Sequence, residues 1–346
     1  MSNSRMTGQP ESDRLDDDLE TVFRLNPEPY TFFDDRRVHR ALTTDPRAYL
    51  DALLEAIESI AFGKASLELP PKQVFVDPGQ RSDFRVMPCV VRFPGRTRKT
   101  VKIIGTNWPR TVVPGEISVG KAFSLHPTEN FIEAGFAGCL LSSARTGACV
   151  ATGLRLLAPD SRHIAIVGSG RVGYYAGLFA ASLGEAERIS FADIVEERAL
   201  LAAQSLRSRF SGLETDTFHP GELPSTSDAL VLATDSEQPI FDASGYRPRL
   251  VVSVGADTDW QSEISPEVLS HYALSVDTQD SPNYGDLAAF RSHGHLDIDK
   301  LPDLFELARD DSRRQSPALF VSTGSALFDN LTIDYLMTQA DAGLRG

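Results

Sequence analysis

Residues 163–184 read HIAIVGSGRVGYYAGLFAASLG, and this stretch decides the fold of the 346-residue chain. Gly168, Gly170 and Gly173 form a GxGxxG pattern directly after an apolar run, which predicts a buried strand, a tight turn and a helix. The first glycine permits the turn, the second lets backbone N–H groups approach a pyrophosphate, and the third allows the helix to pack closely on the strand. Gly184 is placed to end the helix.

An acidic residue in the right place strengthens this prediction. The next apolar run, Arg188–Phe191, leads to Asp193, which lies 20 residues beyond Gly173. A carboxylate there accepts hydrogen bonds from an adenosine ribose and repels a 2′-phosphate, so NAD is favoured as the cofactor. Arg198 lies nearby and is a residue type that pairs with such a phosphate, so NADP stays the alternative. The expected cofactor-binding residues of this motif are Gly168, Ser169, Gly170, Arg171, Val172, Gly173 and Asp193.

The chain downstream continues the same pattern. Short apolar strands alternate with helical stretches in 228–234 (DALVLAT), 249–257 (RLVVSVGAD) and 272–277 (YALSVD). Such alternation predicts a parallel sheet covered by helices on both faces. Residues 318–337 predict a strand, a glycine turn and a closing helix.

The first half of the chain has a different texture. Asp45-Pro46 predicts a helix start within a helical stretch from Tyr30 to Gly63. Strands are expected at Lys72–Val76, Phe84–Phe93 and Thr100–Ile104, and a helix at Ser142–Leu157. We therefore predict an α/β protein in which a Rossmann domain (141–321) follows an α+β substrate-binding and dimerisation domain (21–140 with 322–346). Residues 1–20 are rich in acids and are expected to form a flexible tail.

Composition excludes several classes of protein. Lys and Arg total 34 against 48 Asp and Glu, a net charge of −14, which argues against nucleic-acid and anionic-membrane partners. The sequence holds no apolar run of 18 residues and no signal-peptide pattern, so a cytoplasmic protein is expected. Cys89, Cys139 and Cys149 show no CxxC spacing, and His293 and His295 lack a third ligand, so we expect neither disulfides nor a metal.

A basic segment interrupts this acidic chain. Residues 81–110 carry one acid, Asp83, and eight cations: Arg81, Arg85, Arg92, Arg96, Arg98, Lys99, Lys102 and Arg110. One interpretation is a solvated edge strand, with a hairpin tip at Pro94-Gly95. However, Arg85 and Lys102 lie inside apolar strands, where a charge needs a partner. A substrate carboxylate is the second interpretation.

Taken in order, these signals resemble the ornithine cyclodeaminase/mu-crystallin family over roughly residues 30–340. The motifs that carry the resemblance are Arg85-Val-Met-Pro88, Val101-Lys102 before Trp108-Pro109, Ala144-Arg145-Thr146, Gly168–Gly173, Val254-Gly-Ala-Asp257 and Thr323-Gly-Ser-Ala-Leu-Phe-Asp329. Each is short, but six in the family's order are specific.

The resemblance implies roles for individual residues. Arg85, Lys102 and Arg145 are expected to bind the substrate α-carboxylate, with Lys102 also part of the catalytic centre. Asp257 is expected to be the catalytic acid/base, with a pKa raised by burial. Thr234, Val254, Thr323 and Gly324 are expected beside the nicotinamide half of NAD. The resemblance also implies a homodimer formed through the sheet of the first domain.

The implied reaction is hydride transfer from the Cα of an amino acid or amino-acid conjugate, through an imine. One alternative is a cyclodeaminase that releases ammonia and regenerates NAD, and another is a non-catalytic NAD(P)-binding protein. Residues 86–101 contain no acid to hold a distal amine, which disfavours ornithine. The short loop there resembles the conjugate dehydrogenases of 2,3-diaminopropionate biosynthesis. The substrates of those enzymes carry extra carboxylates, which would suit the basic segment. This branch also implies a role in secondary metabolism. Val254–Asp257 resembles the cyclodeaminase branch instead.

Overall fold

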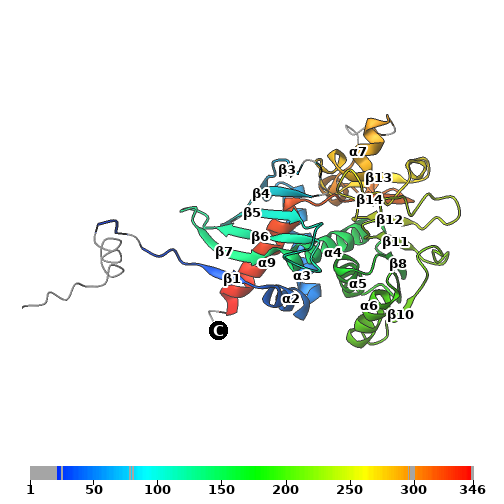
Figure 1. Cartoon of the computed structure of the whole chain (residues 1–346), viewed down its shortest axis with the longest axis horizontal. Helices are drawn as coiled ribbons and strands as arrows, with labels where there is room; N and C mark the ends of the chain where they lie inside the picture. The colour runs from blue at the N-terminus through cyan, green and yellow to red at the C-terminus, as the bar shows by residue number, and fades with distance from the viewer. Residues whose placement is uncertain are drawn as a thin grey trace, which may run out of the picture.

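The computed structural model describes residues 22–24, 26–77, 79, 82–294, 296 and 301–343, and it is built on two seven-stranded sheets (Figure 1). The expected acidic tail, Arg81 and His295 lie outside the described residues. The first sheet belongs to the first half of the chain and the second to the later half, with the final helix returning to the first sheet.

The first sheet is antiparallel except at one edge. Its order is β1-β7-β6-β5-β4-β2, with β3 also paired to β4, and only β1 and β7 run parallel. The hairpin predicted at Pro94-Gly95 is confirmed, since Phe93 pairs with Arg96. The edge-strand interpretation is wrong, because β4 and β5 both lie inside the sheet. The strands are β1 (Thr31–Phe33), β2 (Ser66–Glu68), β3 (Gln73–Val76), β4 (Asp83–Phe93), β5 (Arg96–Thr106), β6 (Ser118–Leu125) and β7 (Ile132–Ala137).

Helices pack against the face of this sheet that carries Met87, Cys89 and Val91. They are α2 (Asp35–Thr44), α4 (Gly138–Leu157) and α9 (Ala326–Gly343), whereas α3 (Pro46–Ala61) packs against other helices, α9 and α4 among them. The helix start predicted at Asp45-Pro46 is confirmed, because the Asp45 carboxylate accepts a hydrogen bond from Ala48 N at 3.0 Å. Residues 31–33 form β1 rather than helix, because their backbone pairs with a strand a hundred residues away.

The second sheet is entirely parallel, in the order β10-β9-β8-β11-β12-β14-β13. Its central strands are wholly buried, as the apolar runs predict. The predicted Rossmann arrangement is therefore confirmed. The elements are β8 (His163–Val167), α5 (Arg171–Leu183), β9 (Arg188–Ala192), α6 (Glu196–Arg209), β10 (Glu214–Thr217), β11 (Ala229–Leu232), β12 (Leu250–Ser253), β13 (Ala273–Val276), α7 (Gly285–Ser292), α8 (Leu304–Arg309) and β14 (Ala318–Val321).

Helix α4 joins the two halves. It is buried along most of its length and packs against α5 and β12 on one side and against α2, α9 and β6 on the other. A Cβ on Gly147 would lie 2.6 Å from the backbone of Tyr175, so a glycine is needed where α4 meets α5. This close packing brings the carboxyl ends of the second sheet beside the first sheet.

None of the described helices combines the length and apolar character that a bilayer crossing requires. Cys89 and Cys149 are buried and Cys139 is partly buried, and all three are free thiols.

Candidate active site between the two sheets

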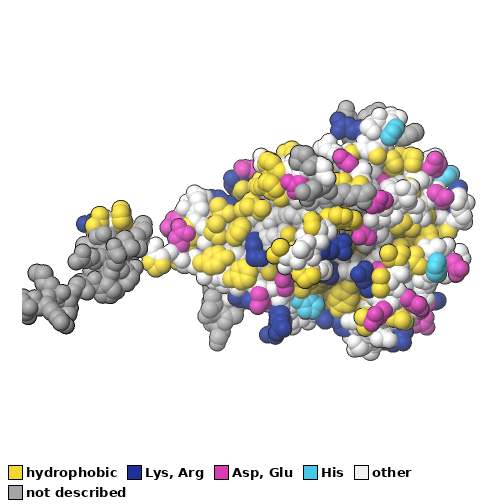
Figure 2. Space-filling view, viewed as in Figure 1, with side chains coloured by type: hydrophobic (Ala, Val, Ile, Leu, Met, Phe, Trp, Pro, Cys, Tyr) yellow, Lys and Arg dark blue, Asp and Glu magenta, His cyan; other side chains and the backbone are white. Residues whose placement is uncertain are grey.

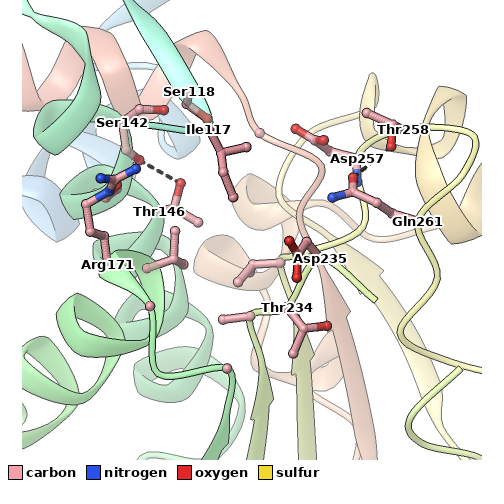
Figure 3. Close-up of a pocket in the computed structure, with 18 of the residues that line it drawn as sticks. Ile117, Ser118, Ser142, Thr146, Arg171, Thr234, Asp235, Asp257, Thr258 and Gln261 are labelled. Carbon is pink, nitrogen blue, oxygen red and sulfur yellow. Dashed lines mark hydrogen bonds between the residues drawn. The ribbon is translucent and has the colours of Figure 1, made fainter. Parts of the chain in front are cut away.

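A cavity of about 570 Å³ lies between the first sheet and the carboxyl ends of the second. Figure 3 shows that Ser142, Thr146 and Arg171 line one side, while Asp257, Thr258 and Gln261 line the other. Thr234 and Asp235 lie between them, at the end of β11. Ligands bind at this edge of open α/β sheets, so the cavity is the candidate site.

The glycine turn fits the role predicted for it. A Cβ on Gly168, at φ +92°, would lie 2.3 Å from the Ala233 carbonyl oxygen, and one on Gly173 would lie 1.8 Å from that of Gly168. A Cβ on Gly170, by contrast, would meet nothing within 4 Å, so the backbone here is open to a ligand. Gly168, Gly170, Arg171 and Val172 line the cavity. Ser169 and Gly173 do not, and Gly173 permits close packing instead.

Asp193 directly follows β9 and lines the cavity at the end where the adenosine of NAD is expected. Its carboxylate accepts hydrogen bonds from Ser169 N and Val195 N, each at 2.8 Å. Arg198 lies 3.9 Å from the same carboxylate, and its side chain is mostly exposed. The backbone amides thus fix a negative charge beside the glycine turn, as the NAD prediction requires.

The three cations expected to bind a carboxylate do meet in this cavity, and we call Arg85, Lys102 and Arg145 the cationic cluster. All three are buried. Arg85 pairs with Asp257 at 2.5 Å and with Asp83 at 2.9 Å. Lys102 and Arg145 share Asp329 of α9, at 2.7 and 3.1 Å. Asp329 therefore offsets one of these two positive charges and holds Lys102 and Arg145 to the closing helix.

Asp257 lies four residues beyond β12, and a third of its side chain is exposed. Burial acts to raise its pKa, but the charges of Arg85 and Lys72 outweigh burial and hold the pKa below its usual range. The prediction of a raised pKa is therefore wrong for this arrangement. The reason is the ion pair with Arg85, which the sequence does not reveal.

Lys72, for which the sequence predicted no role, does not line the cavity but contacts Thr323 and Gly324, which do. Its buried ammonium donates to the Thr323 carbonyl oxygen at 2.6 Å and lies 3.7 Å from the centre of the Tyr284 ring. Burial lowers the pKa of Lys72 to about 8. No local signal marks this residue, because its partners are more than 200 residues away in the chain.

The expected nicotinamide-side residues Thr234, Val254, Thr323 and Gly324 all line the cavity. Gly324 has φ +84°, and a Cβ there would lie 3.3 Å from the guanidinium of Arg145. The turn after β14 thus touches the cationic cluster directly. Trp108 and Trp260, to which the sequence analysis gave no role, also line the cavity.

The remaining basic segment lies elsewhere. Arg92 pairs with Glu68 at 2.6 Å, Arg96 with Asp334 at 3.0 Å, and Arg98 with Glu133 at 2.9 Å. Lys99 donates to Asn130. None of these four lines the cavity, whereas the acid Asp83 does. The expectation that the basic segment suits extra carboxylates is therefore wrong for these four residues, and acids on other elements neutralise three of them.

No group of three metal-ligating side chains occurs within the described part of the chain. His293 is exposed, and its Nδ1 lies 2.7 Å from the Ala289 carbonyl oxygen.

Comparison with protein families gives one extended match. The model of the ornithine cyclodeaminase/mu-crystallin family matches residues 35–340. This range includes the cationic cluster, the glycine turn and Asp257.

Individual relatives are more distant. A Δ1-pyrroline-2-carboxylate reductase of Paracoccus denitrificans is 30% identical over 57% of this chain and 65% of its own length, so the chain spans a little less than two thirds of that relative. An L-lysine cyclodeaminase of Streptomyces rapamycinicus is 28% identical over 79% of this chain and 80% of its own. The solved structure of Thermococcus litoralis Δ1-pyrroline-2-carboxylate reductase, in complex with NADH and L-proline, has the same fold, with a TM-score of 0.79. It covers 90% of this chain and 98% of its own, at 19% identity.

Proposed function

Because this chain belongs to the ornithine cyclodeaminase/mu-crystallin family, we propose that it is an NAD-dependent oxidoreductase acting on the C–N bond of an amino acid, an amino-acid conjugate or the derived imine. One observation carries the proposal. The cationic cluster and Asp257 line the same cavity as the glycine turn and Asp193. A carboxylate-binding site and a dinucleotide site thus face each other.

The residues present fit NAD. Gly170 leaves the backbone of the turn open to a pyrophosphate, and Arg171 begins α5 beside it. Asp193 supplies the acid for the adenosine ribose. When bound, the nicotinamide accepts a hydride from a substrate carbon or returns one. The relatives named above support the same assignment.

The protein's own residues then bind and orient the substrate. Charge-assisted hydrogen bonds from Arg85, Lys102 and Arg145 fix the substrate carboxylate, which directs Cα toward the second sheet. When the substrate carboxylate takes over Arg85, Asp257 loses its closest cation and its pKa rises toward the usual range. Asp257 then takes the proton that the amine nitrogen loses on oxidation, or gives a proton to the imine nitrogen on reduction.

The substrate class follows from the placement of one carboxylate-binding site, the cationic cluster, beside one proton-transfer group, Asp257. We infer that the substrate is a 2-amino acid or the corresponding open-chain or cyclic 2-imino acid. The names of the curated relatives, a pyrroline-carboxylate reductase and a lysine cyclodeaminase, support this class.

A cyclodeaminase is the second candidate. It is favoured by the longer match to L-lysine cyclodeaminase and by Asp83, an acid in the cavity that a distal ammonium could pair with. Asp83 lies 2.9 Å from Arg85 and 3.0 Å from the Thr106 hydroxyl. A purely non-catalytic binding protein is disfavoured, because the cationic cluster and Asp257 are all present.

The experiment is a paired assay of the purified protein. Incubation with NADH and Δ1-pyrroline-2-carboxylate or its six-membered homologue tests reduction, and incubation with NAD⁺ and amino acids tests oxidation. Stoichiometric change in NADH supports the oxidoreductase, while ammonia release without net NADH supports the cyclodeaminase. Neither product with any 2-amino or 2-imino acid would refute both.

The oligomeric proposal is a homodimer formed through the first sheet. On the face of this sheet opposite the helices, the side chains of Phe84 and Ile103 are almost half exposed. The Phe75 ring stacks on that of Phe84, with 4.6 Å between the ring centres. Apolar side chains gather over β4–β7 in Figure 2. An apolar face of this kind favours association with a second copy. Light scattering should show a dimer that Ile103→Asp weakens.

An enzyme that shares the metabolic NAD pool is expected in the cytoplasm.

A further inference from the structure

Glu263 is a fully buried acid that the proposed reaction does not yet use. One carboxylate oxygen accepts from Thr234 N at 2.6 Å and from the Thr234 hydroxyl at 2.9 Å. The other accepts from the Ser253 hydroxyl at 2.7 Å and from Gly255 N at 2.9 Å. Four donors therefore converge on a single carboxylate.

These donors come from the ends of two neighbouring strands. Thr234 follows β11, while Ser253 ends β12 and Gly255 follows it, and both Thr234 and Gly255 line the cavity. The two loops approach very closely, because a Cβ on Gly255 would lie 2.1 Å from the Thr234 carbonyl oxygen and 2.4 Å from Glu263 Oε1. Glu263 thus joins the two loops at a point where position 255 can hold only a glycine.

The segment that carries Glu263 is itself anchored. Asp286, at the start of α7, accepts from the Ser262 hydroxyl at 2.6 Å and from the backbone N–H groups of Glu263 and Ile264 at 2.9 and 3.2 Å. Burial raises the pKa of Glu263, whereas its four donors favour the charged form. Each oxygen faces a backbone N–H, an obligatory donor, and this geometry suits a carboxylate better than an amide.

We propose that Glu263 is a positioning residue, whose carboxylate locks the loops after β11 and β12 in the arrangement that receives the nicotinamide half of NAD and carries Asp257. The inference rests on the proposed function, since it assigns Thr234 to the nicotinamide side. Asp257 is two residues beyond Gly255, so a loop released at Gly255 moves the acid/base group as well.

The test is Glu263→Gln, which keeps size and shape. An amide offers one acceptor oxygen and one NH₂ group, so a donor must face either Thr234 N or Gly255 N. We expect the dissociation constant for NAD⁺ to rise by at least tenfold and kcat to fall by at least tenfold. Affinity for ADP, which lacks the nicotinamide half, should stay within twofold of wild type. Glu267→Gln, an exposed acid four residues on, is the matched control and should match wild type in all three.

Two results would overturn the inference: NAD⁺ affinity and kcat unchanged in Glu263→Gln, or ADP affinity falling as much as NAD⁺ affinity, which would indicate a general structural role. If Glu263→Gln does not fold, Ser253→Ala removes one of the four bonds, and NAD⁺ affinity equal to wild type would then reject the proposal. Wild-type protein that fails to bind NAD⁺ would refute the proposed function instead.

Discussion

The guanidinium of Arg85 lies 2.5 Å from the carboxylate of Asp257, so the residue expected to bind the substrate carboxylate is paired with the residue expected to move the substrate's proton. The pair joins the first sheet to the second across the cavity. Under the proposed function, a substrate carboxylate would compete with Asp257 for the same guanidinium. We therefore propose that substrate binding raises the pKa of Asp257, which would couple recognition to proton transfer.

Replacement of Arg145 by alanine should weaken substrate binding. A charge-assisted bond to a carboxylate contributes about 1.5–3 kcal/mol, so KM for the carboxylate substrate should rise by about tenfold or more. Steady-state kinetics at saturating cofactor measures this. Arg155→Ala, an exposed arginine on the same helix, is the control and should leave KM unchanged. An unchanged KM in Arg145→Ala would reject the carboxylate role.

Asp257→Asn should lower kcat by about 100-fold or more, because an amide cannot exchange the substrate's proton. Affinity for NAD⁺, measured by fluorescence titration, should stay near the wild-type value. Asp259→Asn, two residues further on, offers a matched control with normal turnover. Normal kcat in Asp257→Asn would remove this residue from the mechanism.

Asp193→Asn should relax the choice of cofactor. The change removes the charge that repels a 2′-phosphate and keeps an acceptor oxygen for Ser169 N, at the cost of the bond from Val195 N, while Arg198 remains nearby to meet the phosphate. The ratio of kcat/KM for NADP⁺ to that for NAD⁺ should rise by about tenfold or more. Glu197→Gln serves as a charge-matched control. A ratio that stays at the wild-type value would show that Asp193 does not select the cofactor.

Substrate binding should weaken as pH rises. Burial and the neighbouring charge of Arg145 lower the pKa of Lys102 to about 7, despite the pairing with Asp329. Lys102 therefore loses its positive charge as pH increases from 6 to 9, and KM for the carboxylate should rise several-fold. Lys72, with a pKa of about 8, titrates in the same range, so comparison with Lys102→Arg is needed. The arginine variant keeps its charge and should show a flatter profile; identical profiles would exclude Lys102 as the source.

The parts of the structure that local sequence determines were predicted well. The glycine turn, its flanking strand and helix, Asp193 and the Pro94-Gly95 hairpin each depend on neighbouring residues. Arg85 and Lys102 were singled out as charges inside apolar strands, Arg145 was added by the family resemblance, and the fold does bring the three together.

What the sequence could not show is which charges neutralise each other across the fold. Arg96 and Arg98 lie between Arg85 and Lys102 in sequence, but they pair with Asp334, more than 230 residues away. They therefore do not line the cavity. Lys72 acquires its contacts in the same way, from a turn more than 250 residues further along the chain. The partners of Glu263 lie closer in sequence, in the loops after β11 and β12, but only the parallel pairing of those strands brings the two loops together around it. Ion pairing at long range also reverses the expected direction of the Asp257 pKa.

The central claim, that the cationic cluster holds a carboxylate against the nicotinamide, is tested most directly by a crystal structure with NAD⁺ and pyrrole-2-carboxylate, a planar analogue of a cyclic 2-imino acid. We predict that the carboxylate lies within hydrogen-bonding distance of Arg85, Lys102 and Arg145, with its attached ring carbon about 3–4 Å from nicotinamide C4. If those cations instead stay on Asp257 and Asp329 while the analogue binds away from the nicotinamide, the claim is contradicted.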